Sequence, residues 1–247
     1  VQRLYMGILC AFSLIFVIER LLKNRKKHNF FLAVFFVFFV FLIAGRIAIV
    51  SVLFIIIYYV FIFLKSYMRY VVALSILLLT SFVVLTNNNL SKRIFHSDDN
   101  FRTSYFEKIE MHEPRFLIWK YSFELLKETN LTTGNGFAKT TEKLVEKYTN
   151  ITQEKKRNWF IEKEFNTHNQ YLDILLSQGI LGAFVFLIFL VQAFKLAKDS
   201  KTNLLLLVSM LIYMTVYNNF HRLIGVYLFS LILIFILLNQ DEKKSIK

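Results

Sequence analysis

The residues of this sequence that could do chemistry are arginines and histidines placed beside long apolar segments. Arg46 interrupts the apolar stretch of residues 30–64, and Arg115 lies four residues before Trp119. A guanidinium offers a planar fork of donors that matches a phosphate or a carboxylate. Because a charge deep in a bilayer costs roughly 2.5–3.5 kcal/mol, Arg46 is either an anion clamp or an interfacial arginine at a turn. Taken alone, Arg115 is more simply explained by an ion pair with Glu113.

His168 has a setting suited to proton transfer. The segment from Thr167 to Gln170 has the Thr-x-x-Gln spacing of a capping box and precedes an apolar run. We therefore expect His168 and Asn169 in the first turn of a helix. The helix dipole there favours a neutral imidazole that can accept a proton, and the exposed N–H groups attract phosphate. The alternative is an interfacial histidine with no partner.

Two turns carry further candidate residues. Gly134 and Gly136 form a Gly-x-Gly turn, in which the backbone can approach a substrate closely, although many turns after helices look similar. The polar turn at residues 218–222 contains His221 and Arg222. The alternative role of these two residues is to anchor the turn at the membrane interface. All these groups map to one face of the membrane in the topology described below, and this convergence favours a site there.

Patterns for metal and nucleotide binding are absent from the sequence. It has no His-Glu-x-x-His, Cys-x-x-Cys or Gly-x-Ser-x-Gly motif, and Cys10 is the single cysteine. The net charge of +13 suggests nucleic acid, but the basic residues flank apolar segments, where they orient a protein in the bilayer. We therefore expect no metal, no cofactor and no nucleic-acid partner.

The elements that must position these residues are membrane-spanning helices. The 247 residues are 56% hydrophobic, against about 45–50% in ordinary globular domains, and a water-soluble fold of this length cannot bury so much apolar surface. A bilayer core of about 30 Å needs about 20 apolar residues in a helix. This length predicts seven spans, near residues 4–22, 30–64 (two spans with a tight hairpin at Gly45-Arg46), 70–86, 171–194, 204–217 and 223–238.

The expected fold class is therefore an all-α polytopic membrane protein. Its predicted parts are four spans in residues 1–86, a long extracytoplasmic segment at residues 87–167 and three spans in residues 168–247. The short loops after alternate spans hold twelve lysines and arginines, whereas the short loops on the other side hold only Arg46 and Arg222, which places the former in the cytoplasm and the long segment outside. The chain begins with Val1 and its start is predicted outside, so we expect further spans upstream.

One helix is expected within the outer segment. Pro114 suits the first turn of a helix, and Phe116, Trp119, Phe123 and Leu126 recur at spacings of three, four and three. This pattern predicts an amphipathic helix that ends near residues 129–130. Its apolar face would lie on the membrane surface or against the bundle.

Four motifs, taken in order, resemble the O-antigen ligase/polymerase family of bacterial envelope proteins. They are Ala-Gly-Arg46-Ile-Ala, Arg115-x-x-x-Trp119, Gly134-x-Gly136-Phe, and Thr-His168-Asn169-Gln-Tyr-Leu followed by Gly-Ile-Leu-Gly at residues 179–182. The resemblance covers roughly residues 40–182. The sequence departs from the family pattern at Gly45, where many relatives have Ser, and lacks the Pro often found before the two glycines.

The resemblance implies a membrane glycosyltransferase that acts on the periplasmic face of the bacterial inner membrane without metal. Its donor would be a glycan on undecaprenyl diphosphate, held by Arg46 and Arg115, and His168 would assist the acceptor hydroxyl in an inverting transfer. The resemblance and the polar clusters together give a substrate-binding set of Trp119, Gly134, Gly136, Asn169, His221 and Arg222.

The acceptor remains open at this stage. It would be a lipid A core sugar for an O-antigen ligase, a second lipid-linked glycan for a repeat-unit polymerase, or a Ser/Thr side chain for a protein O-oligosaccharyltransferase. A different class, the non-catalytic polysaccharide exporter or flippase, predicts polar or broken helices at mid-depth of the membrane. A sensor with a ligand-binding outer segment has no need of Arg46 or His168.

Overall fold

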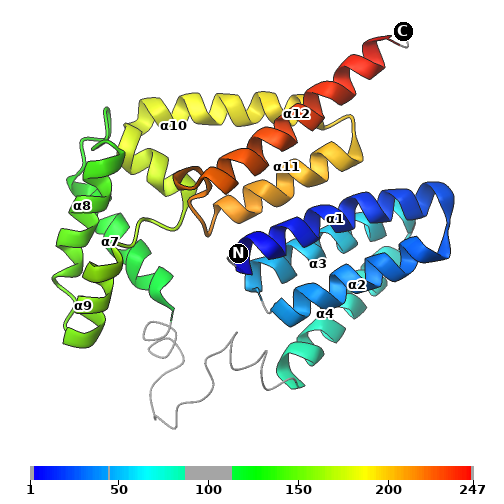
Figure 1. Ribbon diagram of the computed structural model, residues 1–247, viewed down its shortest axis with the longest axis horizontal. Helices are drawn as coiled ribbons and strands as arrows, with labels where there is room; N and C mark the ends of the chain where they lie inside the picture. The colour runs from blue at the N-terminus through cyan, green and yellow to red at the C-terminus, as the bar shows by residue number, and fades with distance from the viewer. Residues whose placement is uncertain (1–2, 44, 87–112, 246–247) are drawn as a thin grey trace. The chain divides into compact units, whose positions relative to one another are not determined.

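The computed structural model describes residues 3–43, 45–86 and 113–245 (Figure 1). Residues 87–112 of the predicted outer segment lie outside the described residues. In the described part the chain is helical and contains no strand, so the predicted all-α class is confirmed. The helices are α1 (Arg3–Asn24), α2 (Lys27–Ile43), α3 (Arg46–Phe63), α4 (Met68–Thr86), α7 (Pro114–Glu128), α8 (Phe137–Tyr148), α9 (Glu154–Lys163), α10 (Gln170–Ala197), α11 (Lys201–Met214), the 3₁₀ turn η1 (Asn219–His221) and α12 (Leu223–Ser245).

Each predicted span coincides with an apolar helix. Four helices are long and apolar enough to cross a membrane, namely α1, α3, α4 and α10. The apolar parts of α2, α11 and α12 are shorter, at 10–17 residues. At 1.5 Å per residue, the 14 residues of α11 extend over roughly 21 Å, less than the bilayer core of about 30 Å. The count of seven crossings therefore stays a prediction.

Contacts divide the chain into two compact units. The first unit comprises Val1–Thr103 and Ser200–Ile212, and the second comprises Ser104–Asp199 and Tyr213–Lys247. In the first unit α1 packs against α2 and α3, and α3 packs against α4. Helix α2 ends at Ile43 and α3 begins at Arg46, with Gly45 as its N-cap, so the long apolar stretch is divided at the predicted position. The division into three sequence segments remains a prediction about membrane topology.

The second unit has a hydrophobic core of its own, formed mainly by the three shorter helices α7, α8 and α9. This core joins α7, α8, α9 and the beginning of α10, and Tyr148 and Phe160 are its largest fully buried side chains. The rings of these two residues meet edge to face, with their centroids 5.1 Å apart. Leu172 and Leu176 of α10 belong to the same core. The beginning of α10 is therefore buried by protein.

Helix α7 starts at Pro114 and ends at Glu128, as predicted, and Trp119 and Leu126 of the predicted apolar stripe pack against the core. Phe116 and Phe123 are 51% and 56% exposed, whereas Leu117, Tyr121 and Leu125 are buried against the core. Both stripes have helical spacing, so periodicity alone could not choose between them. Packing against α8 and α10 decided which stripe is buried.

The fifth predicted span is not a continuous helix. Gly179 has φ 66° and ψ −167°, a conformation that divides α10 into two helical parts. Residues of the first part are mostly buried, whereas Leu181, Phe184 and Val185 of the second part are 59–66% exposed, as expected for a lipid-facing helix. Only the residues after Gly179 therefore have the exposure pattern of a lipid-facing helix.

The loop before α8 provides backbone partners for this break. The N–H groups of Asn135 and Gly136 donate to the carbonyl oxygens of Leu176 and Ser177 at 2.9 and 2.7 Å, and the N–H of Ile180 donates to Leu131 O at 2.6 Å. Helix ends buried without such partners are costly. The loop and the break therefore stabilise each other.

We expect Gly179→Ala to destabilise the protein by about 2–3 kcal/mol or more. Its backbone lies in a region reserved for glycine, and a Cβ would lie 2.6 Å from the carbonyl oxygen of Leu131. Thermal unfolding of the purified protein in detergent measures the effect. Gly45→Ala is the control, because a Cβ there makes only ordinary contacts at 3.6 and 3.8 Å. Equal melting temperatures for the two variants would contradict the assigned strain.

Candidate functional site

The candidate site lies in the second unit, where the beginning of α7, the beginning of α10 and the turn at residues 217–222 come together. Trp119 of α7 donates its indole N–H to the carbonyl oxygen of Thr167 at 3.1 Å. Gln170, the first residue of α10, accepts a hydrogen bond from the backbone N–H of Phe220 at 2.9 Å. These two contacts connect three segments that are distant in the sequence.

The predicted capping box at Thr167 is wrong. Helix α10 begins at Gln170, and its N-cap is Asn169, whose side-chain oxygen accepts from the N–H groups of Tyr171 and Leu172 at 3.0 Å each. His168 therefore precedes the helix, in a left-handed conformation with φ 46°. Asn169 is the N-cap because its side chain accepts from two N–H groups of the helix, whereas the Thr167 hydroxyl is hydrogen-bonded to Asp173 and Asn218.

Thr167 takes part in a buried polar cluster with Asp173 and Asn218. Its hydroxyl lies 3.3 Å from Oδ1 of Asp173 and accepts from Nδ2 of Asn218 at 2.8 Å. All three side chains are buried. A buried polar side chain is stable only when it is hydrogen-bonded, so this cluster fixes the turn against the beginning of α10.

Asp173 is the functional residue that sequence reasoning missed. Its carboxylate is 2% exposed, and Oδ2 lies 2.8 Å from Nε2 of His221. The hydrogen bond to Asp173 raises the pKa of His221 against the opposing effect of burial. The available signal was a carboxylate within an apolar run, since such a group must be paired. Its partner lies 48 residues away and could not be read from spacing.

Arg115 forms the ion pair that the sequence suggested. A guanidinium nitrogen of Arg115 donates to Glu113 at 3.1 Å, and the Glu113 carboxylate is buried. The pair leaves Arg115 close enough to His168 for its charge to lower the pKa of that imidazole. Pairing with Glu113 therefore orients Arg115 beside the histidine.

His168 is a neutral imidazole at neutral pH. Burial lowers its pKa to about 4, and the charges of Arg115 and Arg222 act in the same direction. The predicted neutral state is confirmed, but burial and the arginines cause it rather than a position in the first helical turn. Its ring lies between Phe165 and Tyr217, at centroid distances of 5.7 and 6.2 Å. Nδ1 is buried and has no hydrogen-bond partner among the described residues.

Aromatic side chains surround the remaining cations. The Arg222 guanidinium lies 5.9 Å from the centroid of the Tyr217 ring, and the Phe137 ring lies 6.0 Å from that of His221. Phe137 is 47% exposed and directly follows Gly136. The predicted glycine turn is therefore connected to the site through its neighbour.

The predicted glycines have different surroundings. A Cβ on Gly134 would lie 2.5 Å from backbone atoms of Ser177 and Gly179, so the close backbone approach there is to α10. A Cβ on Gly136 would meet nothing within 4 Å, and its φ is 83°. Contact of either residue with a substrate remains a prediction.

Arg46 belongs to the other unit. It is the first residue of α3, directly after the N-cap Gly45. The site described above contains Arg115, Trp119, His168, Asn169, His221 and Arg222, and a role for Arg46 beside them stays a prediction.

The side chains of the site could together hold an oxyanion and accept a proton. Arg115 and Arg222 are cations, Asp173 raises the pKa of His221, and the carboxylates of Glu113 and Asp173 are the partners of Arg115 and His221. Such a set suits a phosphate and offers neutral His168 as a base. Among the described residues no group of three or more His, Cys, Asp or Glu side chains is arranged to hold a metal ion.

Long apolar helices, one of which begins at a polar centre that contains arginines and histidines, are the features of a helical membrane protein. The family model described as O-antigen ligase matches residues 31–187. The match covers more than half of the chain, so the chain belongs to the O-antigen ligase family. No curated protein and no solved structure matches the chain.

The family implies membrane glycan transfer of the O-antigen ligase or polymerase kind, with a lipid-linked glycan as donor and a glycan as acceptor. With the apolar helices, it also indicates a bacterial membrane protein that acts in polysaccharide biosynthesis. The resemblance predicted from the motifs is confirmed at this level.

We expect the two histidines of the site to titrate at opposite ends of the acidic range. His221 should titrate above its ordinary pKa of 6.5, and His168 at about 4, so at pH 5.5 only His221 is charged. NMR titration of labelled histidine rings in detergent measures both values. Asp173→Asn should lower the pKa of His221, because the asparagine cannot stabilise the imidazolium as a carboxylate does.

Glu113→Gln is the matched control for this experiment. Glu113 raises the pKa of His168, so its neutralisation should lower the pKa of His168 further and leave that of His221 unchanged. An unchanged pKa of His221 in Asp173→Asn would show that this carboxylate does not hold the proton.

Proposed function

We propose that the protein transfers a glycan from undecaprenyl diphosphate to an acceptor hydroxyl at the outer face of the bacterial inner membrane, as an O-antigen ligase. The observation that carries the proposal is the neutral imidazole of His168 beside the charges of Arg115 and Arg222. This arrangement offers a proton acceptor and two phosphate-binding groups in one place. Membership of the O-antigen ligase family supports the same chemistry.

The cations of the site would bind the diphosphate of the donor. Arg115 is oriented by Glu113, and Asp173 raises the pKa of His221 and so favours its protonated form, in which both side chains would face an anion as cations. When the glycosidic bond breaks, negative charge develops on the diphosphate oxygen that leaves. Positioned cations stabilise this charge more in the transition state than in the ground state. The resemblance also implies a phosphate-binding role for Arg46, which belongs to the other unit.

His168 would remove the acceptor proton. The hydroxyl oxygen attacks the anomeric carbon, the bond from that carbon to the diphosphate oxygen breaks, and the proton passes to His168. Direct displacement inverts the anomeric configuration and needs no metal. A group with a pKa of about 4 is a weak base, but a bound diphosphate cancels the charges of Arg115 and Arg222 that lower this pKa. The donor therefore strengthens the base that it needs.

The remaining predicted residues would act through the backbone and the walls of the site. Trp119 and Asn169 hold the segment that contains His168, through the indole N–H and the helix cap. Gly136 leaves open space at the beginning of α8, next to the exposed ring of Phe137, where a sugar could be placed. Gly134 maintains this loop by its close contact with α10.

The nearest alternatives share this site and differ only in the acceptor. A repeat-unit polymerase uses a second lipid-linked glycan, and a protein O-oligosaccharyltransferase uses a Ser or Thr side chain. A non-catalytic exporter would use broken helices to line a path through the membrane. The break at Gly179 has protein partners in the loop before α8, which favours a structural role for it.

A transfer assay with the purified protein tests the proposal. The donor is undecaprenyl-diphosphate glycan, and the three acceptors are lipid A core, a second lipid-linked glycan and a Ser/Thr-rich protein. We expect transfer to lipid A core, lowered about 10²–10⁴-fold in His168→Ala by loss of the base. Arg115→Gln should also lower kcat, because one donor to the leaving oxygen is lost.

Lys127→Gln is the control for these variants. Lys127 is an exposed residue of the same helix as Arg115, so its replacement removes a positive charge without touching the site. Full transfer in His168→Ala would exclude the base role. Transfer to none of the acceptors, with donor binding intact, would favour the exporter.

The pH dependence tests the coupling between donor and base. The base acts only when neutral, so activity must fall as the pH falls. We expect the acid limb of kcat/KM to reflect the free His168, with a pKa of about 4, and the acid limb of kcat to lie at higher pH, because the bound diphosphate raises this pKa. Coincident limbs would contradict the coupling.

A further inference from the structure

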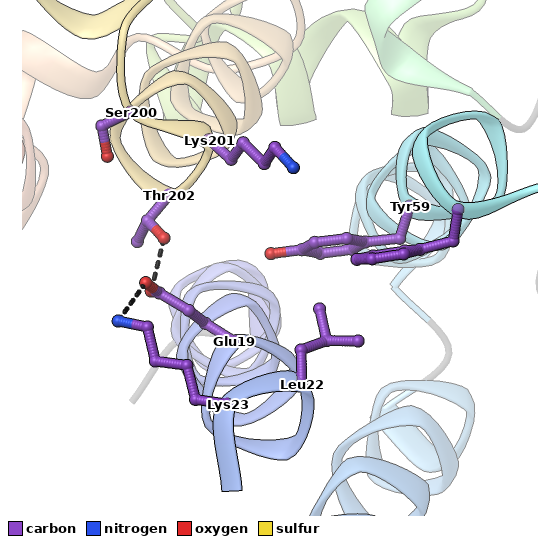
Figure 2. Close-up of a pocket in the computed structure, with 8 residues that line it drawn as sticks. Glu19, Leu22, Lys23, Tyr59, Ser200, Lys201 and Thr202 are labelled. Atoms are coloured by element: carbon purple, nitrogen blue, oxygen red, sulfur yellow. Dashed lines mark hydrogen bonds and ion pairs between the residues drawn. The ribbon is translucent and has the colours of Figure 1, made fainter. Parts of the chain in front are cut away.

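An unassigned pocket lies in the first unit. The residues of the proposed site belong to the second unit, so none of them lines this pocket. Its volume is about 330 Å³, and it is enclosed by α1, α3 and the beginning of α11 (Figure 2). The polar side chains that matter for its chemistry are Glu19, Lys23, Tyr59, Lys201 and Thr202. The pocket therefore combines one carboxylate, two ammonium groups and two hydroxyls.

The carboxylate of Glu19 is already used within the protein. Oε2 accepts a hydrogen bond from the Thr202 hydroxyl at 2.5 Å, and Oε1 accepts from Nζ of Lys23 at 3.0 Å (Figure 2). Lys23 balances its charge. A cation has little to gain from a carboxylate that is satisfied in this way.

Lys201 and Tyr59 are not used in this way. The ammonium group of Lys201 forms no ion pair with a described residue and lies 5.7 Å from the centroid of the Phe63 ring. Tyr59 is 8% exposed, and its hydroxyl has no hydrogen-bond partner among the described residues. Figure 2 shows this hydroxyl directed toward Glu19 and Thr202, into the pocket. The ring is buried, and the hydroxyl at its end can donate a hydrogen bond to a ligand in the pocket.

The balance of charge in the pocket is positive. Two ammonium groups face one carboxylate, and Lys201 and Thr202 are the first two residues of α11, where the N–H groups and the helix dipole attract anions. The pocket also lies at the C-terminal ends of α1 and α3, two helices of membrane-spanning length. In a bilayer, the ends of such helices lie at the level of the lipid headgroups.

We propose that this pocket binds a phosphate oxyanion, with Lys201 as its main charge and the Tyr59 hydroxyl as a donor. The position at the helix ends makes the phosphate of an anionic phospholipid headgroup the expected source. A soluble phosphate presents the same oxyanion chemistry, and the experiment separates the two. This inference is independent of glycan transfer, because none of its residues belongs to the proposed catalytic site.

Native mass spectrometry of the delipidated protein in detergent tests the proposal. The probes are phosphatidylglycerol and, as a comparison without a phosphate, diacylglycerol with the same acyl chains. We expect one phosphatidylglycerol to be retained in preference to diacylglycerol. Lys201→Gln should weaken its binding about tenfold by loss of a charged partner, and Tyr59→Phe about threefold by loss of a neutral hydrogen bond.

Lys198→Gln is the matched control. Lys198 is exposed, lies three residues from Lys201 and does not line the pocket, so its replacement should leave lipid binding unchanged. Tyr59→Phe keeps the ring and its packing, which separates the hydroxyl from any effect on folding. Melting temperatures of all variants are compared in the same detergent.

Competition with an excess of inorganic phosphate identifies the source. Displacement of phosphatidylglycerol would assign the pocket to phosphate groups in general, and failure to displace it would assign the pocket to the intact lipid headgroup; both support the oxyanion. Binding of phosphatidylglycerol by Lys201→Gln and Tyr59→Phe with the affinity of Lys198→Gln would overturn the proposal. Unaltered glycan transfer in these variants would leave the proposed function as it stands.

Discussion

The buried carboxylate of Asp173 is the constraint from which the candidate site follows. A carboxylate 2% exposed within an apolar helix must have partners, and it finds them in His221 and in the hydroxyl of Thr167. His221 carries the turn that contains Arg222, and Thr167 is the residue before His168. The position of one desolvated carboxylate is therefore connected to the positions of His221, Arg222 and His168. Removal of His221 would leave the carboxylate in the interior without its imidazole partner, which is far costlier than loss of a surface ion pair.

A second constraint is the backbone break in α10. It separates a first part that is buried by protein from a second part whose apolar side chains are exposed. The backbone at Gly179 ends the first helical part, and the loop before α8 supplies hydrogen bonds across the break. Gly134 is required in that loop because its backbone lies against Ser177 and Gly179. Two of the motifs that resemble the family, Gly-x-Gly and Gly-x-x-Gly, thus meet in space. Their joint role in packing explains why both occur in a chain of this family.

The electrostatics of the site act in opposite directions on its two histidines. Burial lowers the pKa of His168 to about 4, and the charges of Arg115 and Arg222 act in the same direction. In the proposed reaction, a bound diphosphate would neutralise these charges and so raise the basicity of His168. The pKa of His221 is raised instead, because the carboxylate of Asp173 lies within hydrogen-bond distance of its ring.

The sequence by itself determined the features that depend on local composition. Apolar length indicated membrane helices, Pro114 marked the beginning of α7, and Gly45 marked the division of the apolar stretch before Arg46, because each acts on its own stretch of backbone. The order of motifs indicated the family, and the match to the family model confirmed it. The sequence also placed Arg115 and His168 among the residues of interest.

Tertiary structure decided everything that depends on contacts between distant segments. The pairing of Asp173 with His221 spans 48 residues, and no spacing rule predicts it. Packing chose the buried stripe of α7, since both of its apolar stripes fit a helix equally well. Asn169 caps α10 in place of the expected Thr167, because the threonine hydroxyl is hydrogen-bonded within the buried cluster. Several partners are locally possible for each of these side chains, and the burial of its surroundings determines which partner it contacts.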